Sequence, residues 1–429
     1  METIKIGLIG LGTVGAGVLE IISDPENQAK IENTIGRKLA VKTIVVHNPN
    51  KPRPVDTTGI NVTTDVDEIV KDPEIYIVVE VMGGIHPANE IIEELLQAGK
   101  NVVTANKDLI ASNGPKLSSL ANANGCDLMY EASVAGGIPI LRTITNSFTA
   151  DQILEVKGIV NGTTNFILTQ MRENQWSYDH ALKRAQELGF AEADPTNDVA
   201  GIDAAYKMII LSLFAFGTQI KLSEFNVSGI ENITDQDVKQ AGQWGYVIKL
   251  MGVSKLVNEK LFVEVAPTLV PKSHPMAVVD NENNAVMVTG AAVGDTLFYG
   301  PGAGGLPTAN SVLSDITSEA KNITLKTTGK SFNSYQHERQ LADPADVKYS
   351  YYLAMTMPDV SGQMLAFTTL MTKVGASFER IEQTNREDKL ADVAVITHAM
   401  TNQQLAELKQ LVAESETLKL DAAYKVLPL

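Results

Sequence analysis

The chain has 429 residues, which at about 150 residues per domain corresponds to two or three domains. Hydrophobic residues make up 44% and charged residues 20%, a globular balance that excludes a largely disordered chain. The formal net charge of −16 leaves no general basic surface and therefore disfavours a nucleic-acid partner. The single cysteine excludes a disulfide framework, and no apolar run reaches the ~18–20 residues of a membrane span. These features predict a cytoplasmic, multidomain protein with no membrane partner.

Short apolar runs alternate with helical stretches up to about residue 131. The runs at 4–9, 41–46, 75–81, 101–104 and 127–130 predict strands, and the stretches at 87–98 and 115–123 predict helices. Strands that alternate with helices through short loops favour a parallel α/β sheet.

After residue 131 the pattern changes to one of mixed elements. Strands are predicted at 154–159, 258–271 and 286–299, and helices at 163–174, 179–188, 199–220 and 310–320. Residues 328–346 are polar and unpatterned, which is typical of a linker. Beyond it, residues 349–414 predict a strand, a helix, two strands and a helix, the βαββα pattern of a further domain.

A glycine-rich turn follows the first predicted strand. Its residues are Gly10, Leu11, Gly12, Thr13, Val14 and Gly15, a G-x-G-x-x-G pattern that opens a helix. Such a turn brings the backbone close to a pyrophosphate, to which the helix N-terminus donates N–H groups. Because a strand precedes the turn and a helix follows it, we interpret it as a dinucleotide-binding site rather than a structural turn.

The end of the second predicted strand bears on which dinucleotide binds. A carboxylate there would bind the ribose of NAD, but residues 46–53 contain none and do contain Lys51 and Arg53. These cations can pair with the 2′-phosphate of NADP, or they can be two solvated loop residues. The sequence therefore favours NADP and leaves NAD open.

Two lysines, Lys207 and Lys107, occupy positions that suit a catalytic or ligand-binding role. Asp203 and Lys207 are one helical turn apart, at the start of an apolar helix that partly desolvates the lysine. Such a pair can donate a proton to a carbonyl oxygen that receives hydride, although an ordinary helix ion pair has the same spacing. Lys107 follows Thr104 at the carboxyl end of a predicted strand, where ligands of open α/β sheets bind; a surface lysine is the alternative.

The chain as a whole resembles homoserine dehydrogenase. The resemblance is carried by the glycine turn, Thr104–Lys107, Glu131–Pro139, Gly158–Asn165 and the segment 189–207, and it covers about residues 1–325. The remainder, from about residue 349, resembles an ACT regulatory domain.

The resemblance implies NAD(P)-dependent interconversion of L-aspartate 4-semialdehyde and L-homoserine, a step of threonine and methionine biosynthesis. It implies an α/β fold with a Rossmann-type parallel sheet, an α+β catalytic and dimerisation domain, and a C-terminal βαββαβ ACT-like domain. The expected boundaries are 1–131 for the nucleotide domain, against which a helix near 310–325 packs, 132–325 for the catalytic domain, 328–348 for the linker and 349–429 for the ACT-like domain.

The same resemblance assigns roles to individual residues. Lys207 matches the acid/base lysine, Asp203 and Glu192 match carboxylates that hold substrate, and Lys107 matches a lysine near the nicotinamide and the reacting carbon. The positions that line the cofactor include Thr13, Val14, Thr104 and Gly302. A monovalent-cation site, with sodium as the expected ion, is implied at Glu131, Val134, Gly136 and Ile138, where a glycine-rich loop turns hard carbonyl oxygens inward.

The sequence departs from the family pattern at two places. His47 and Asn48 stand where Arg-Asp-like residues are common, which bears on the choice of cofactor. In the tail, the turn that contains Asp359 and Gly362 lacks the usual proline before glycine, which bears on threonine as an effector.

Two other functions fit part of the sequence. A phosphorylating aldehyde dehydrogenase needs a cysteine thiolate, for which Cys126 is the only candidate. A non-catalytic sensor of dinucleotide and amino acid, with a regulatory tail, needs binding without turnover. For the dehydrogenase we expect a homodimer, since two-fold assemblies are the commonest.

Overall fold

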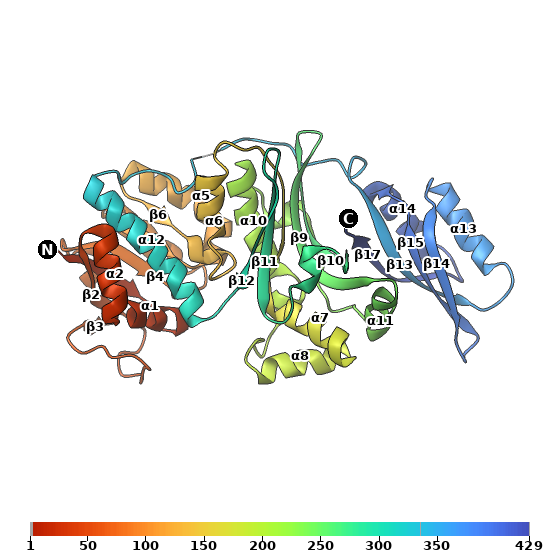
Figure 1. The fold of residues 1–429 in the computed structure, drawn as a ribbon, viewed down its shortest axis with the longest axis horizontal. Coiled ribbons are helices and arrows are strands. Elements are labelled where there is room, and N and C mark those ends of the chain that lie inside the picture. Colours follow the sequence, from red (N-terminus) through yellow and green to blue (C-terminus); the bar gives the residue numbers. More distant parts are fainter. Residues whose placement is uncertain (1–2, 335, 429) are drawn as a thin grey trace. The chain divides into compact units, whose positions relative to one another are not determined.

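The computed structural model describes residues 3–334 and 336–428. Contacts within the chain divide it into two compact units. Unit 1 consists of Met1–Ile153, Ile209–Leu222 and Gly290–Glu338, and unit 2 consists of Leu154–Met208, Ser223–Thr289 and Arg339–Leu429 (Figure 1).

Six strands of the described chain form the sheet of unit 1. They are β1 (Thr3–Ile9), β2 (Lys38–Val45), β3 (Asn61–Thr63), β4 (Ile75–Glu80), β5 (Asn101–Thr104) and β6 (Leu128–Met129). All neighbours are parallel and the order is β3-β2-β1-β4-β5-β6. From β1 the chain builds the sheet outward through β2 and β3 on one side, and then through β4, β5 and β6 on the other. Open α/β sheets bind their ligands at this switch point, between β1 and β4. The predicted Rossmann-type sheet is confirmed.

The helices of unit 1 cover this sheet. They are α1 (Thr13–Ser23), α2 (Pro25–Ile35), α3 (Asp67–Val70), α4 (Ala88–Gln97), α5 (Lys107–Ala123), α6 (Ile140–Ser147) and α12 (Gly305–Leu325); the unit also contains a 3-10 turn at Glu131–Ser133 and the strand β12 (Gly294–Pro301). Helix α12 packs beside α1, as Figure 1 shows, and its apolar residues join the core under β1 and β2. The two helices can approach closely because residue 17 of α1 is glycine. A Cβ at this position would lie 2.9 Å from the carbonyl oxygen of Gly305 in α12.

Unit 2 is built on a mixed sheet. Its strands are β7 (Ile153–Ile159), β8 (Asn226–Val227), β9 (Tyr246–Val257), β10 (Lys260–Pro271), β11 (Asn283–Gly290), β13 (Lys348–Pro358), β14 (Phe378–Asn385), β15 (Leu390–Thr397), β16 (Met400–Thr401) and β17 (Lys419–Val426). The order includes β11-β7-β9-β10-β17-β13-β15-β14, with β8 beside β10 and β16 beside β13. The β10–β17 pairing is parallel, whereas β10 is antiparallel to β9 and β17 to β13.

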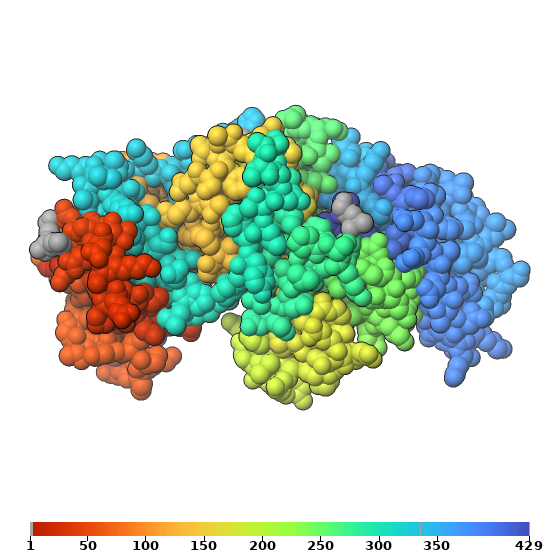
Figure 2. Space-filling view, in the orientation of Figure 1, coloured from red at the N-terminus to blue at the C-terminus, as the bar shows by residue number. Residues whose placement is uncertain are grey.

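The helices of unit 2 include the one on which the catalytic lysine is predicted. They are α7 (Gly162–Asn174), α8 (Tyr178–Glu187), α9 (Thr196–Val199), α10 (Ile202–Phe216), α11 (Asp235–Gln243), α13 (Gln363–Lys373) and α14 (Asn402–Ala413), with 3-10 turns at Leu222–Glu224 and Pro275–Val278. Helix α10 continues into the part of the chain assigned to unit 1. Helices α7 and α8, in yellow, are visible at the surface in Figure 2. From residue 348 the order β13-α13-β14-β15-α14-β17 is βαββαβ apart from the short strand β16.

Three predicted elements have wrong bounds. The helix expected at 199–220 is interrupted at Gly201, whose φ of +82° is left-handed, so that α9 and α10 are separate. The strand expected at 286–299 is the pair β11 and β12, which a turn separates. The helix expected from Pro115 begins instead at Lys107, where the Asn106 side chain accepts a hydrogen bond from the Leu109 N–H and caps it.

Within the described part of the chain, the structure contains no helix that is both long enough and apolar enough to cross a membrane.

Candidate active site

The two residues predicted to hold a proton, Asp203 and Lys207, form a buried ion pair on α10. Their Nζ and Oδ2 atoms lie 2.8 Å apart, and both residues are more than nine-tenths buried. Lys207 Nζ also donates a hydrogen bond of 2.6 Å to the carbonyl oxygen of Val160, directly after β7. The ammonium is therefore fixed by a carboxylate on its own helix and by the backbone at a strand end.

Asn161 completes this cluster, although sequence reasoning did not assign it a role. Its amide donates to Asp203 at 2.8 Å and to Asp198 at 2.7 Å. Its side-chain oxygen accepts from the Thr164 N–H and caps α7. One asparagine thus orients two carboxylates toward the lysine while it starts the helix that follows β7.

The carboxyl groups of this cluster, those of Asp198 and Asp203, are largely shielded from solvent. Burial raises the pKa of Asp198, and the nearby Asp203 carboxylate raises it further, although the Asn161 amide opposes both effects. Glu192, by contrast, is exposed in the loop after α8, where its backbone carbonyl accepts from Gln186 at 3.1 Å. The described contacts do not connect its carboxylate to the Lys207 cluster.

In unit 1 the glycine turn has the geometry that a phosphate site needs. Gly10 has a φ of +99°, and a Cβ there would lie 2.8 Å from the Val81 carbonyl oxygen. Gly15 sits so close to Gly10 that a Cβ would lie 2.2 Å from its carbonyl oxygen. Gly12, at the N-terminus of α1, has no heavy atom within 4 Å of the place where a Cβ would be. The backbone before α1 is therefore tight on the protein side and open where an anion would approach.

The ends of the neighbouring strands β4 and β5 are connected by side-chain hydrogen bonds to Glu80. The Thr104 hydroxyl donates to Glu80 at 2.6 Å, and the Met82 N–H donates to the same carboxylate at 2.7 Å. Thr104 is fully buried, and its hydroxyl is used in the hydrogen bond to Glu80. Lys107 is the first residue of α5; its side chain is about one-third exposed, and its Nζ lies 3.9 Å from Asp108.

Comparison with known proteins covers the glycine turn of unit 1 and the Lys207 cluster of unit 2. Residues 10–131 match the family model for the NAD-binding domain of homoserine dehydrogenase, and residues 139–317 match the model for homoserine dehydrogenase. The homoserine dehydrogenase of Bacillus subtilis is 43% identical to this chain, with 99% of each chain covered. The chain belongs to the homoserine dehydrogenase family. Similarity to the Lactococcus lactis homoserine dehydrogenase is 44% over 99% of each chain, and a Thiobacillus denitrificans homoserine dehydrogenase structure matches at a TM-score of 0.93, with 35% identity over 100% and 99% of the two chains.

In this member of the homoserine dehydrogenase family, the loop expected to hold a cation is a tight turn. Ala135 and Gly136 have φ values of 54° and 51°, and a Cβ on Gly136 would lie 2.4 Å from the carbonyl oxygen of Gly302. The Glu131 carboxylate accepts from the N–H groups of Leu141 and Arg142 at 2.9 and 2.7 Å, and so it caps α6. Cation ligands here would consequently be backbone carbonyl oxygens, those of Glu131, Val134, Gly136 and Ile138.

Buried carboxyl groups extend from this turn along α12. Burial, with Asp315 nearby, raises the pKa of Glu131 to about 7, and burial raises the pKa of Asp315 to about 6. Burial and the neighbouring Asp127 raise the pKa of Glu319 to about 9. Arg142 pairs with Asp315, which leaves Glu319 as the carboxyl group that folding most strongly keeps protonated.

The Glu319 shift predicts a pH-dependent stability. Folding raises this pKa above its ordinary value, so the native state holds a proton that the unfolded state releases, and stability falls as pH rises from about 4.5 to 9. We expect Glu319→Gln to increase the free energy of unfolding at pH 8 by about 1–3 kcal/mol and to change it little at pH 5. Urea unfolding at the two pH values measures this. Glu20→Gln, at an exposed position of α1, is the control, and an equal effect of Glu319→Gln at both pH values would contradict the assignment.

Cys126 does not have the environment of a catalytic thiolate. It is buried, its thiol donates to the carbonyl oxygens of Leu96 and Ala121, and burial raises its pKa to about 11. A reactive cysteine needs a lowered pKa and access to substrate. The geometry therefore favours hydride transfer without a covalent thiol intermediate.

Proposed function

We propose that this member of the homoserine dehydrogenase family catalyses the NAD(P)H-dependent, reversible reduction of L-aspartate 4-semialdehyde to L-homoserine, a step of threonine and methionine biosynthesis. The observation that carries the proposal is the buried Lys207 ammonium, held by Asp203 and the Val160 carbonyl in a chain that also has an open glycine turn before α1. The first feature suits a proton donor to an aldehyde oxygen, and the second suits a dinucleotide.

Lys207 is the group to which we assign the proton. An ammonium has three N–H donors, and the bonds to Asp203 and Val160 use two of them. The third can donate to the aldehyde oxygen and stabilise the alkoxide charge that develops there. Asp203 orients the lysine, and Asn161 in turn holds Asp203. A bound nicotinamide supplies the hydride.

Two further residues are assigned to substrate. We propose that Glu192 accepts hydrogen bonds from the α-ammonium of the substrate, and that Lys107, at the N-terminus of α5, lies near the reacting carbon. Both side chains have the solvent access that a substrate-binding group needs, since Glu192 is exposed and Lys107 is partly exposed. Proximity of the two reactants then accounts for much of the rate.

We propose NADP as the preferred cofactor. Gly10–Gly15 and the N-terminus of α1 fit a pyrophosphate, and the loop after β2 lacks the carboxylate that would bind the NAD ribose. The Arg53 guanidinium is fixed in this loop by the carbonyl oxygens of Asn48, Pro49 and Lys51, at 2.7 to 3.1 Å. One related structure, a hyperthermophilic archaeal homoserine dehydrogenase of 28% identity and TM-score 0.62, is a complex with NADPH.

The exposed Lys51 provides the test of cofactor preference. We expect Lys51→Ala to raise the KM for NADPH roughly fivefold, the loss of about 1 kcal/mol for an exposed ion pair, and to leave the KM for NADH unchanged. Lys38→Ala, at the opposite end of β2, is the matched control. Equal changes with both cofactors would show that Lys51 does not contact the 2′-phosphate.

A sodium ion at the 131–138 turn and a regulatory tail complete the proposal. The carbonyl oxygens of Gly136 and Ile138 accept one hydrogen bond each, from Ser311 and Ile140, and a carbonyl oxygen has a second lone pair for an alkali ion. The βαββαβ order from β13 to β17 supports an ACT domain, with threonine as the proposed effector and a homodimer as the proposed assembly.

A turnover assay tests the function. With NADPH and L-aspartate 4-semialdehyde, we expect NADPH oxidation and formation of L-homoserine in equal amounts. The competing function is a sensor that binds dinucleotide and amino acid without turnover. Tight binding of NADPH by an enzyme that does not oxidise it in the presence of the aldehyde would support the sensor and overturn the proposed dehydrogenase.

A further inference from the structure

The loop that follows α8, residues 188–195, carries Glu192, the residue proposed to hold the substrate ammonium. Helices α7 and α8 pack against each other, and the chain leaves α8 in a tight turn (Figure 1). Gly189 has a φ of +79°, and the N–H groups of the next two residues both donate to the Ala185 carbonyl oxygen, at 2.9 and 3.2 Å. This left-handed helix end fixes the direction in which the loop departs.

Phe190, the residue after this turn, packs on α7 although it lies at the surface. Its ring centroid is 4.8 Å from that of Phe166, at an interplanar angle of 43°. Its carbonyl oxygen accepts a hydrogen bond of 2.6 Å from the Thr163 hydroxyl. Phe166 and Thr163 are both more than nine-tenths buried and lie three residues apart, on one face of α7. The ring and the carbonyl group of one residue therefore hold the loop to a single turn of α7.

The turn of α7 that contacts Phe190 also belongs to the Lys207 cluster. Thr163 is the second residue of α7 and follows the capping Asn161 by two residues. Its side chain also interacts with the Asp198 carboxyl group, and this interaction opposes the rise in the pKa of Asp198 that burial causes. The loop is therefore held by the same helix start that orients the carboxyl groups of the cluster.

A second attachment lies at Glu192 itself. The Gln186 amide, on α8, donates to the carbonyl oxygens of Glu192 and Ala193 at 3.1 and 3.4 Å. These bonds fix the backbone of residue 192, while its side chain remains exposed. A group that binds the substrate ammonium must stand within hydrogen-bond distance of it, and a displacement of about 1 Å weakens such an interaction. The attachments at residues 190, 192 and 193 therefore determine where the carboxylate stands.

We propose that Phe190 is a positioning residue for Glu192 and thereby sets the preference of the enzyme for aldehydes that carry an α-ammonium group. The inference rests on the proposed function, in which Glu192 accepts hydrogen bonds from that ammonium. Phe190 acts by holding the loop against α7, through its ring on Phe166 and its carbonyl group on Thr163. Without the ring the loop is held less firmly, and the carboxylate occupies the binding position for a smaller fraction of the time.

The test compares two aldehydes, L-aspartate 4-semialdehyde and 4-oxobutanoate, which lacks the amino group. The measured quantity is the ratio of their kcat/KM values in the full-length enzyme with saturating NADPH. We expect Phe190→Ala to lower this ratio about tenfold, as for a weakened hydrogen bond to a charged group, through a higher KM for L-aspartate 4-semialdehyde. The KM for NADPH should not change. Gln186→Met, which releases the Glu192 carbonyl oxygen, should lower the ratio in the same way, whereas Phe190→Tyr keeps a ring on Phe166 and should retain it.

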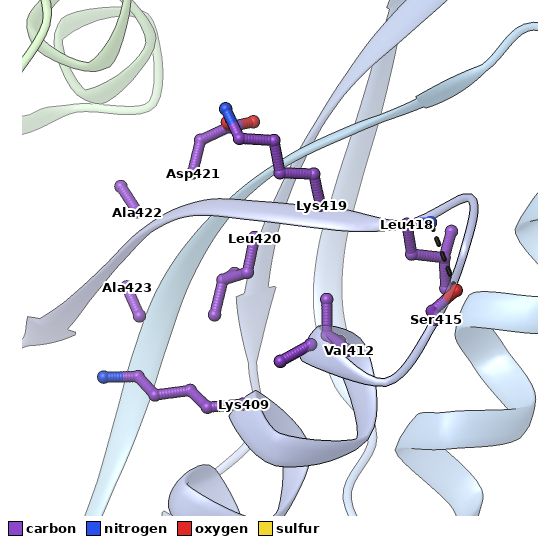
Figure 3. Close-up of a pocket in the computed structure, with 10 residues that line it drawn as sticks. Lys409, Val412, Ser415, Leu418, Lys419, Leu420, Asp421, Ala422 and Ala423 are labelled. Carbon is purple, nitrogen blue, oxygen red and sulfur yellow. Dashed lines mark hydrogen bonds and ion pairs between the residues drawn. The ribbon is translucent and has the colours of Figure 1, made fainter.

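A double variant shows whether Phe190 acts through the carboxylate. Glu192→Gln alone should lower the ratio at least about tenfold, and in that background Phe190→Ala should lower it no further, because both changes remove the same interaction. Two controls should keep the wild-type ratio. Leu188→Ala changes an exposed residue of the same loop, and Lys409→Ala changes a lysine that projects from α14 at a pocket beside β17 (Figure 3).

The outcomes separate this proposal from the proposed function. A wild-type ratio in Phe190→Ala, or a further decrease when this change is added to Glu192→Gln, would overturn the role of Phe190. An unchanged ratio in Glu192→Gln would overturn it as well, since the ammonium would then be bound elsewhere. Thermal unfolding shows whether Phe190→Ala is folded; if it were not, Gln186→Met would decide the question by the same criteria. Absence of turnover in the wild type would instead overturn the dehydrogenase.

Discussion

Replacement of Lys207 by alanine is expected to lower kcat by about 10²–10⁴-fold, the usual contribution of a general acid. Lys207 Nζ is the proton donor of the cluster, because Asp203 and Asp198 accept hydrogen bonds there and the Asn161 amide uses its N–H groups to hold these two side chains. The affinity for NADPH, measured by fluorescence titration, should be unchanged, because Lys207 contacts residues of unit 2 and none of the glycine turn.

Two controls accompany this variant. Lys207→Ala leaves Asp203 buried without its cation, which destabilises the protein, so thermal unfolding must show that the variant is folded under assay conditions. Lys183→Ala, at an exposed position of α8, should retain full activity. A parallel loss of NADPH binding and turnover would place Lys207 in cofactor binding and remove it from the proton transfer.

The nucleotide-binding sheet was the most predictable part of the molecule. Strands β1, β4 and β5 are short apolar runs that are almost entirely buried, and the glycine turn joins β1 to a helix, whereas the short, polar strand β3 was not predicted. Both signals are local in sequence, so they can be recognised before the fold is known. The helix starting at Lys107 was missed in part because Pro115 suggested a start, whereas the capping residue is Asn106.

Only part of the Lys207 cluster could be predicted from local sequence patterns. The Asp203–Lys207 pair was found from its spacing on one helix. Asn161 is 42 residues away from Asp203 in the sequence and joins the cluster only because the fold brings the end of β7 to the first turns of α10. The one available signal was an Asn before a glycine at the end of a predicted strand, and that pattern is equally typical of a helix cap. Asn161 performs both functions.

The pairing of β17 with β10 could not be predicted from sequence either. Only two residue pairs join these strands, and they connect segments more than 150 residues apart. The buried Glu264–Lys425 ion pair beside them is likewise invisible in composition or periodicity. Consequently, the sequence shows a C-terminal α/β pattern but not the sheet that this pattern shares with the earlier strands.

A second large effect is expected at Gly12. We expect Gly12→Val to abolish NADPH binding at assay concentrations, a loss of at least about 100-fold or ~2.7 kcal/mol, while the protein stays folded. The space around a Cβ at residue 12 is empty of protein atoms within 4 Å, so the substitution meets no neighbour in the fold. It meets only the region in front of the α1 N-terminus that a pyrophosphate would occupy.

Gly15 provides the contrasting variant. A Cβ there would lie 2.2 Å from the Gly10 carbonyl oxygen, so Gly15→Ala should lower the melting temperature because the turn itself must move. Gly12→Val should leave the melting temperature of the cofactor-free protein within a few degrees of the wild type and remove the stabilisation that NADPH adds. If NADPH still raised the melting temperature of Gly12→Val as it does that of the wild type, the phosphate would bind elsewhere. The open face of the turn would then need another explanation, since a residue that packs against nothing has no structural reason to be glycine.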